Sequence, residues 1–267
     1  MEQRQPEASP RLLARIGGML YLIIIVLGLF GEMFVREKLV VSGDAAATAA
    51  NLKSQESLWR FGIATELCML ICAIALAVIF YALLRPVSRD LALLAAAFNL
   101  VSIAVEAAYS LHLVAALFPL GDAGYLGAFR PEQLHAMVSL SVKSHAYGFG
   151  ISLIFFGCFC VVIGYLIFRS GYLPKVVGVL MQIAGLCYLV NSFALILAPG
   201  LADRLYPAIL VPSFIGEASL CLWLLVKGVN IERWNLYFTF THTIVQRSTP
   251  GLSSGALPEK INRSPSN

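Results

Sequence analysis

Long apolar segments alternate with shorter polar segments along most of this chain. Six of the apolar segments reach about the 20 residues that a helix needs to cross a hydrocarbon layer about 30 Å thick. We therefore expect spanning helices at about residues 16–35, 62–84, 91–118, 147–168, 176–198 and 205–226. Residues 1–15 precede this membrane domain of residues 16–228. A polar, turn-rich tail of residues 229–267 follows it and is expected to be largely disordered.

The composition points to the same class of protein. Hydrophobic residues make up 59% of the 267 residues and charged residues only 13%, whereas about one quarter of a soluble domain is charged. The expected fold class is therefore an all-α, polytopic membrane helix bundle with the lipid bilayer as its partner. The net charge of +4 gives no reason to expect nucleic acid, because the basic residues gather at the ends of the apolar segments.

The distribution of lysine and arginine predicts the orientation of the helices. Of the 19 basic residues, 12 fall on the side of the two termini and 6 on the opposite side, with Lys143 unassigned. Cytoplasmic loops carry the excess of basic residues in multi-pass membrane proteins. Both termini are therefore expected in the cytoplasm.

Glycine and capping residues predict local features of the helices. Glycines recur every seven residues in the fourth and fifth spans, and such stripes favour close helix packing: Gly150, Gly157, Gly164, Gly178 and Gly185. In the first outer loop, Ser42 or Asp44 is placed to cap a short surface helix. In "RSGYLPK", Gly171 suits the end of one helix and Pro174 the start of the next.

Several segments resemble a known family. "ARIGGMLYLIIIVLGLFGEMFV", "GDAAATAANL", "SHAYGFGISLIFFGCFCVVIGYLIFRSGYLPKVVGVL" and "GLCYLVNSF" are similar to segments of the bacterial DUF4386 family, a domain of unknown function. The similarity covers about residues 11–228, and the succession of HAYG, FFG and RSGYLP is its most specific part. The resemblance implies an all-helical, multi-pass protein of the bacterial plasma membrane. It implies no activity, catalytic residue or cofactor.

Ionisable side chains within the spans are the candidate site residues, because charge at membrane depth is costly and is often functional. Counting 1.5 Å per residue from the cytoplasmic end of each helix places Glu217 near the middle and Glu106 less deep. Lys143 and His145 fall at the outer edge, where a lysine can extend its charge into water. The candidate ligand-binding residues are Glu106, Glu217, Glu66, Glu32, Lys143, His145 and Asn191.

Helical spacing suggests how these residues converge. Asn99, Ser102, Glu106 and Tyr109 follow one face of the third span, and we expect such polar stripes to face the bundle interior. The four glutamates would then line an outward-opening polar cavity, with Lys143 and His145 at its mouth.

The glutamates can also be interpreted without a functional role. Glu32 and Glu66 lie close enough to the interface to be solvated. Glu106 and Glu217 could be neutral, because burial favours the protonated form of a carboxylic acid, or could pair with Lys143 or His145.

Three classes of function remain open on the sequence. The first is a membrane protein that binds or transports a small ligand or ion. The second is an intramembrane enzyme that uses Glu and His with or without a metal, although no HExxH or GxSxG motif supports it. The third is a non-catalytic scaffold that acts through helix packing. We favour a non-enzymatic protein with no assigned catalytic residue, metal ligand or cofactor, and the sequence indicates no oligomeric state.

Overall fold

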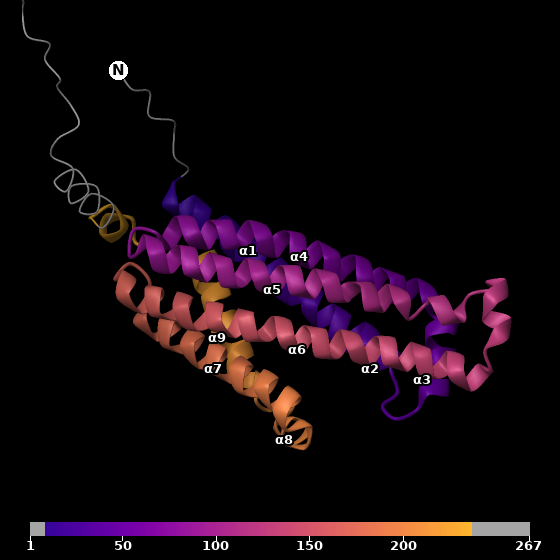
Figure 1. Cartoon of the computed structure of the whole chain (residues 1–267). Helices are drawn as coiled ribbons and strands as arrows, with labels where there is room; N and C mark the ends of the chain where they lie inside the picture. Colours follow the sequence, from indigo (N-terminus) through magenta and orange to yellow (C-terminus); the bar gives the residue numbers. More distant parts are fainter. Residues whose placement is uncertain (1–8, 237–267) are drawn as a thin grey trace, which may run out of the picture.

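The computed structural model describes residues 9–236, and every regular element in that range is a helix (Figure 1). The first span is α1 (Pro10–Leu29), which continues through the π-helix η1 (Phe30–Arg36) into α2 (Glu37–Leu39). The next spans are α4 (Glu56–Leu84), α5 (Arg89–Ala115), α6 (Pro131–Ser170) and α7 (Lys175–Leu197). The shorter elements are α3 (Ala45–Ser54), η2 (Phe118–Leu120), η3 (Gly124–Ala128) and α8 (Pro199–Leu205), and α9 (Leu210–Val226) ends the series.

Five of these helical stretches in residues 9–236 are long and apolar enough to cross a membrane. The pair α8 and α9 forms a sixth candidate span that is bent by 57° at a short break. The chain is therefore a multi-pass membrane protein with the predicted polytopic helical fold.

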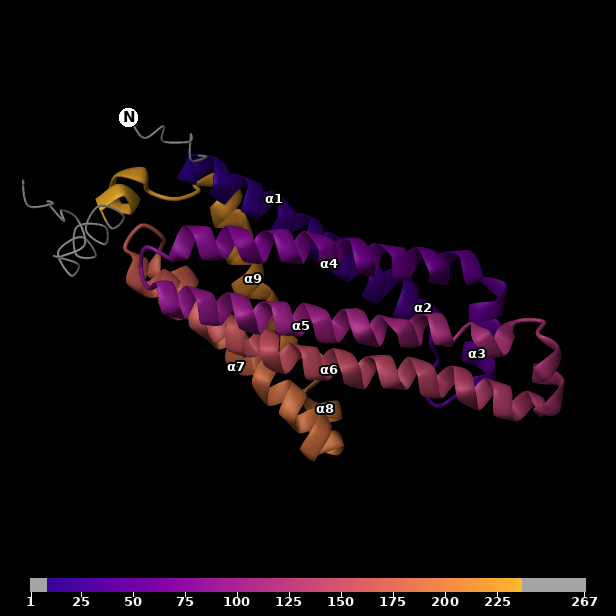
Figure 2. The same cartoon turned by 45° about the horizontal axis from the view of Figure 1, so that its top comes forward.

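The six spans form a closed ring. Each span packs against the next one along the chain, in the order α1, α4, α5, α6, α7 and α9, and α9 closes the ring by packing against α1. Short turns join α4 to α5 and α6 to α7, which makes these pairs antiparallel neighbours. The start of α1 and the end of α9 lie at the same end of the bundle as these turns (Figure 1). We call this the terminal end, and the end that carries α3, η2 and η3 the loop end (Figure 2).

The bundle contains two hydrophobic cores. The larger core fills the ring toward the terminal end, with Phe80, Phe159, Ile163 and Leu220 among its buried members. The smaller core lies at the loop end, where Trp59 and other buried side chains join α3 to the ends of the spans: Val35, Leu39, Leu52, Leu113 and Val138.

Two of the predicted spans differ more than the others from the observed helices. The fourth was expected at 147–168, but α6 begins at Pro131 and is about 60 Å long at 1.5 Å per residue. The extra turns are more polar than a membrane span, and they stay helical because residues such as Val138 pack in the smaller core. The sixth was expected as one helix at 205–226, but it is broken between Leu205 and Leu210.

The local predictions for caps and glycines are confirmed. The Asp44 carboxylate accepts a hydrogen bond of 2.9 Å from the backbone N–H of Ala47 at the start of α3. Gly171 ends α6 with a φ of 68°, which favours glycine. Gly157 lies against the backbone of Gly185, so that the glycine stripes of α6 and α7 meet.

Part of the polar tail packs on the bundle. The indole N–H of Trp234 and the hydroxyl of Tyr172 both donate to the carbonyl of Leu83, at 3.3 Å and 2.6 Å. This carbonyl belongs to the last turn of α4, where no helical donor is available. The expectation of disorder for the rest of the tail concerns residues 237–267, which lie outside the described residues.

Candidate functional site

Charged residues mark the part of the bundle that a bilayer can cover. Arg60 and Lys143 are exposed toward the loop end of α4 and α6, and Arg85 and Arg169 lie at their terminal ends. Along either helix the two positions are about 37–39 Å apart at 1.5 Å per residue. This is close to the roughly 40 Å of a bilayer with its interfacial layers. Polar residues between these levels lie at membrane depth.

Glu66 is the centre of a polar cluster about 9 Å inside the level of Arg60. Its side chain is only 5% exposed. One carboxylate oxygen accepts a hydrogen bond of 2.6 Å from the Ser110 hydroxyl and lies 3.1 Å from Nε2 of His145. The other oxygen accepts a hydrogen bond of 2.8 Å from Nη1 of Arg36. Four helical segments, η1, α4, α5 and α6, therefore meet at one carboxylate.

Arg36 links Glu66 to a second carboxylate. Its Nε lies 2.7 Å from the carboxylate of Glu32, which is 44% exposed. Both residues belong to the π-helix η1, a rare form that occurs often at functional sites. The guanidinium lies over Gly31, where an added Cβ atom would be at an ordinary contact distance of 3.8 Å from it. A charged chain thus runs from exposed Glu32 to buried Glu66.

Glu106 adds a third carboxyl group one turn from Ser110 on α5. The Ser110 hydroxyl oxygen also lies 3.0 Å from the backbone carbonyl oxygen of Glu106. The Glu106 carboxyl is close enough to Glu66, Arg36 and Ser152 to interact with all three. We call Glu32, Arg36, Glu66, Glu106, Ser110 and His145 the loop-side cluster. It contains three carboxyl groups but only one arginine and one histidine.

The predicted polar stripe of α5 faces the neighbouring helix α6. Asn99 and Ser102 are buried, and the Ser102 hydroxyl donates 2.9 Å to the carbonyl of Ser152. The Tyr109 ring lies directly against Gly148, where any larger side chain would collide with it. Within HAYG, His145 thus contacts Glu66, and Gly148 makes room for the ring beside it.

Glu217 has different partners from the loop-side cluster. Its carboxylate accepts hydrogen bonds from the hydroxyls of Tyr21 on α1, at 3.1 Å, and of Tyr188 on α7. Tyr188 lies one turn beyond Gly185, which packs against Gly157 about midway between Lys143 and Arg169. Glu217 therefore lies at about the level of the contact between Gly157 and Gly185, midway between the charged residues at the two ends of α6.

The structure brings together some of the predicted site residues and not others. Glu32, Glu66, Glu106 and His145 belong to the loop-side cluster. Glu217 is held apart by two tyrosines, Lys143 is exposed, and Asn191 is half-buried on α7. Among residues 9–236, the hydrogen bonds and ion pairs of the glutamates above do not involve Lys143 or Asn191.

Where the sequence predicts an open cavity, the polar side chains of the loop-side cluster contact one another directly. Next to Arg36, a cavity of about 10 Å³ is lined by Trp59, Gly62 and Leu113 among others, which is room for about one water molecule. His145 was expected at a cavity mouth and is instead buried against Glu66.

Four of the residues that complete these clusters are not among the candidates from the sequence: Tyr21, Arg36, Ser110 and Tyr188. In the sequence Arg36 counts among the charges that set orientation, and its spacing of four from Glu32 is also a recognisable pairing signal. Ser110 lies four residues beyond Glu106, in line with the polar stripe of α5. Tyr21 shares a helical face of the first span with Glu32, which predicts that it faces the bundle interior, whereas Tyr188 carries no signal of its own.

The order of the groups limits the chemistry. In a serine hydrolase, histidine lies between the serine and the acid and removes the proton from the hydroxyl. Here the carboxylate of Glu66 lies between Ser110 and His145, and the hydroxyl donates to it. Across residues 9–236, no three His, Cys, Asp or Glu side chains are grouped to hold a metal ion. The arrangement can bind and redistribute protons.

Comparisons with known proteins place the chain in a family. It belongs to the family described as domain of unknown function (DUF4386), whose profile matches residues 16–228. An uncharacterized protein of Archaeoglobus fulgidus is 27% identical over 166 residues, which cover 61% of this chain and 82% of that relative. No solved structure matches the chain.

Proposed function

We propose that this DUF4386 protein binds protons at membrane depth, through the loop-side cluster, from the side of the membrane that the loop end faces. The observation that carries the proposal is that three carboxyl groups share one arginine and one histidine. With Glu32, Glu66 and Glu106 ionised and His145 neutral, the cluster carries two negative charges more than positive ones.

Like charges that lie close together in a medium of low polarity cannot all remain ionised cheaply. Arg36 and His145 both contact Glu66 directly, and Arg36 also contacts Glu32. Glu106 makes no ion pair with either cation of this cluster, and its carboxyl group is close enough to the carboxylate of Glu66 to be repelled by it. Glu106 is therefore the group at which we expect the proton to be taken up.

The packing favours a proton over a larger ligand. The cavity beside Arg36 has about 10 Å³, which holds about one water molecule. A proton needs no added volume and can move along hydroxyl, carboxyl and water groups. Deep carboxylates in membrane helices commonly serve proton relays. This supports the ion-handling class of function over an intramembrane enzyme, and a bound small cation is the second candidate that the excess negative charge favours.

The membrane and the orientation are part of the proposal. We propose the plasma membrane, with both termini in the cytoplasm and the loop end outside. The basic residues are concentrated at the terminal end, which is the cytoplasmic pattern. A protease added to intact cells is expected to leave a C-terminal epitope on the tail intact. Removal of the epitope without cell lysis would show the opposite orientation.

Infrared spectroscopy of the protein in lipid bilayers tests proton binding directly. When the pH is lowered, the C=O band of a buried protonated carboxyl group is expected to appear, and it should be absent from the Glu106→Gln variant. Repeating the titration with Na⁺, K⁺ or Ca²⁺ distinguishes proton binding from cation binding. A cation that binds the cluster would compete with the proton and move the midpoint of the titration to lower pH. A spectrum in which no buried carboxyl titrates would contradict the proposal.

A further inference from the structure

Five aromatic side chains cross the middle of the bundle in continuous contact. Tyr21 of α1 packs against Phe80 of α4, and Phe80 packs against Phe159 of α6, with ring centroids 6.0 Å apart in both pairs. Phe159 contacts Phe156, and Phe156 contacts Tyr188 of α7, each at 5.5 Å. This row of rings extends from α1 through α4 and α6 to α7.

Glu217 closes the row into a loop of side chains. One oxygen of its carboxylate accepts a hydrogen bond from Tyr21 and the other from Tyr188. Glu217 lies on α9, the helix that also closes the ring of spans against α1. We call these five aromatic residues and Glu217 the cross-bundle ring.

The interior of the bundle differs on the two sides of the cross-bundle ring. On its loop side lie nearly all the buried polar side chains of the described spans: Thr65, Glu66, Asn99, Ser102, Ser110, His145, Ser152, Ser192 and Ser213. On its terminal side the core is apolar, and the buried Ser170 there belongs to the turn that ends α6. The ring therefore separates a polar interior from an apolar one.

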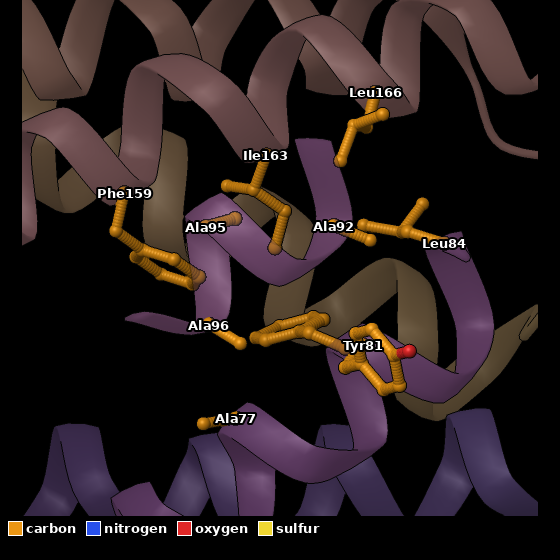
Figure 3. Close-up of a pocket in the computed structure, with 10 residues that line it drawn as sticks. Ala77, Tyr81, Leu84, Ala92, Ala95, Ala96, Phe159, Ile163 and Leu166 are labelled. Carbon is orange, nitrogen blue, oxygen red and sulfur yellow. The ribbon is translucent and has the colours of Figure 1, made fainter. Parts of the chain in front are cut away.

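A small cavity lies against the ring on its apolar side (Figure 3). Phe80 and Phe159 form its wall on the side of the ring, and it extends past Ile163 to Leu84 and Leu166 near the terminal end. Four alanines of α4 and α5 leave this space: Ala77, Ala92, Ala95 and Ala96. Phe159 thus lines this cavity of about 10 Å³ and is also a member of the cross-bundle ring.

We propose that the cross-bundle ring is a closed gate that stops protons bound in the loop-side cluster from reaching the terminal end. The inference rests on the proposed proton binding. Aromatic rings supply the apolar barrier, and the two hydrogen bonds to Glu217 hold the barrier shut across the seam between α9 and its neighbours α1 and α7. Opening requires that α9 moves away from Tyr21 or Tyr188. Because the helix is broken between α8 and α9, the loop-side end of α9 can move without carrying α8 with it as one rigid helix.

Proton leak through proteoliposomes tests the gate. Vesicles that contain a pH-sensitive dye are given an inside-negative potassium diffusion potential with valinomycin, and the rate of internal acidification is measured. Wild-type protein is expected to admit protons no faster than protein-free vesicles. Phe159→Ala should leak at least about tenfold faster, which corresponds to a barrier lower by about 1.4 kcal/mol.

A matched control and milder variants complete the test. Phe193→Ala removes a ring of the same size from α7, but Phe193 is 47% exposed. This variant should therefore admit protons no faster than wild type. Tyr188→Phe and Glu217→Gln keep the volume of the cross-bundle ring but weaken its hydrogen bonds to Glu217. They should also leak faster than wild type, and they replace Phe159→Ala as the test if that variant fails to fold. Proton binding is read separately by infrared titration. If these variants admit protons no faster than wild type while a carboxyl group still titrates, the gate is contradicted and proton binding is not. A wild-type protein that leaks as fast as Phe159→Ala would also contradict the gate.

Discussion

Replacement of Arg36 by alanine is expected to lower the free energy of unfolding by about 3–5 kcal/mol, because it leaves a buried charge without its partner. The Glu66 side chain is 5% exposed and would lose its contact with the permanent cation Arg36 at 2.8 Å. Glu32 would lose the same partner at 2.7 Å. The change is measured as unfolding of the purified protein in one detergent under fixed conditions.

The chain contains a matched control for this substitution. Arg60 and Glu56 form an i, i+4 pair with the same Nε–carboxylate distance of 2.7 Å as Arg36 and Glu32, but both are largely exposed. Exposed pairs contribute about 0–1 kcal/mol, so Arg60→Ala should have little effect. Adding Glu66→Gln to Arg36→Ala should restore part of the stability. Equal losses for Arg36→Ala and Arg60→Ala would show that the cluster is not a buried charge network.

Gly157→Leu is expected to destabilise the bundle by about 3 kcal/mol, at the upper end of the usual cost of overpacking. A Cβ atom at this position would lie 2.9 Å from the backbone oxygen of Gly185 and 3.0 Å from Cγ of Leu189. The backbone oxygen cannot move aside as a side chain can, so α6 and α7 must separate. Thermal unfolding in detergent measures the loss.

Gly28→Leu is the control for this prediction. A Cβ at Gly28 would meet only the sulfur of Met69, the end of a flexible side chain, at an ordinary 3.5 Å. Leucine also has the higher helix propensity, so this variant should unfold near the wild-type temperature. An unchanged melting temperature for Gly157→Leu would contradict the close approach of α6 and α7.

The positions of the spans could be predicted from the sequence because hydrophobic length alone decides them. The extension of α6 to Pro131 could not, because its stability comes from contacts between Val138 and residues far away in the chain. The break before Leu210 does have a signal in the sequence, because Pro207 lies within it and proline interrupts a helix.

The candidate site shows a similar division. The depth of Glu66 and Glu217 follows from counting residues along a helix. Their partners depend on how the helices are rotated and on which neighbours they meet, and the single sequence carries little of this information. Glu106 and Glu217 therefore belong to different clusters, although both were expected in one cavity.

The motifs that carry the family resemblance also have physical roles in the bundle. His145 of HAYG contacts Glu66 at 3.1 Å, and Gly157 of FFG permits the close approach to α7. Within RSGYLP, Gly171 adopts a positive φ, and the Tyr172 hydroxyl caps the carbonyl of Leu83 at the end of α4. Only the first of these motifs touches the loop-side cluster, so the other two are expected to affect stability rather than proton binding.

The most direct test of proton binding at membrane depth is the infrared difference spectrum between alkaline and acidic buffer for wild type, Glu106→Gln and Glu132→Gln. Glu132 is an exposed residue in the first turn of α6 and serves as the matched control. We expect one buried carboxyl band that shifts when H₂O is replaced by D₂O, is present in wild type and Glu132→Gln, and is absent from Glu106→Gln. The same band in all three proteins, or in none, would contradict the assignment of the proton to Glu106.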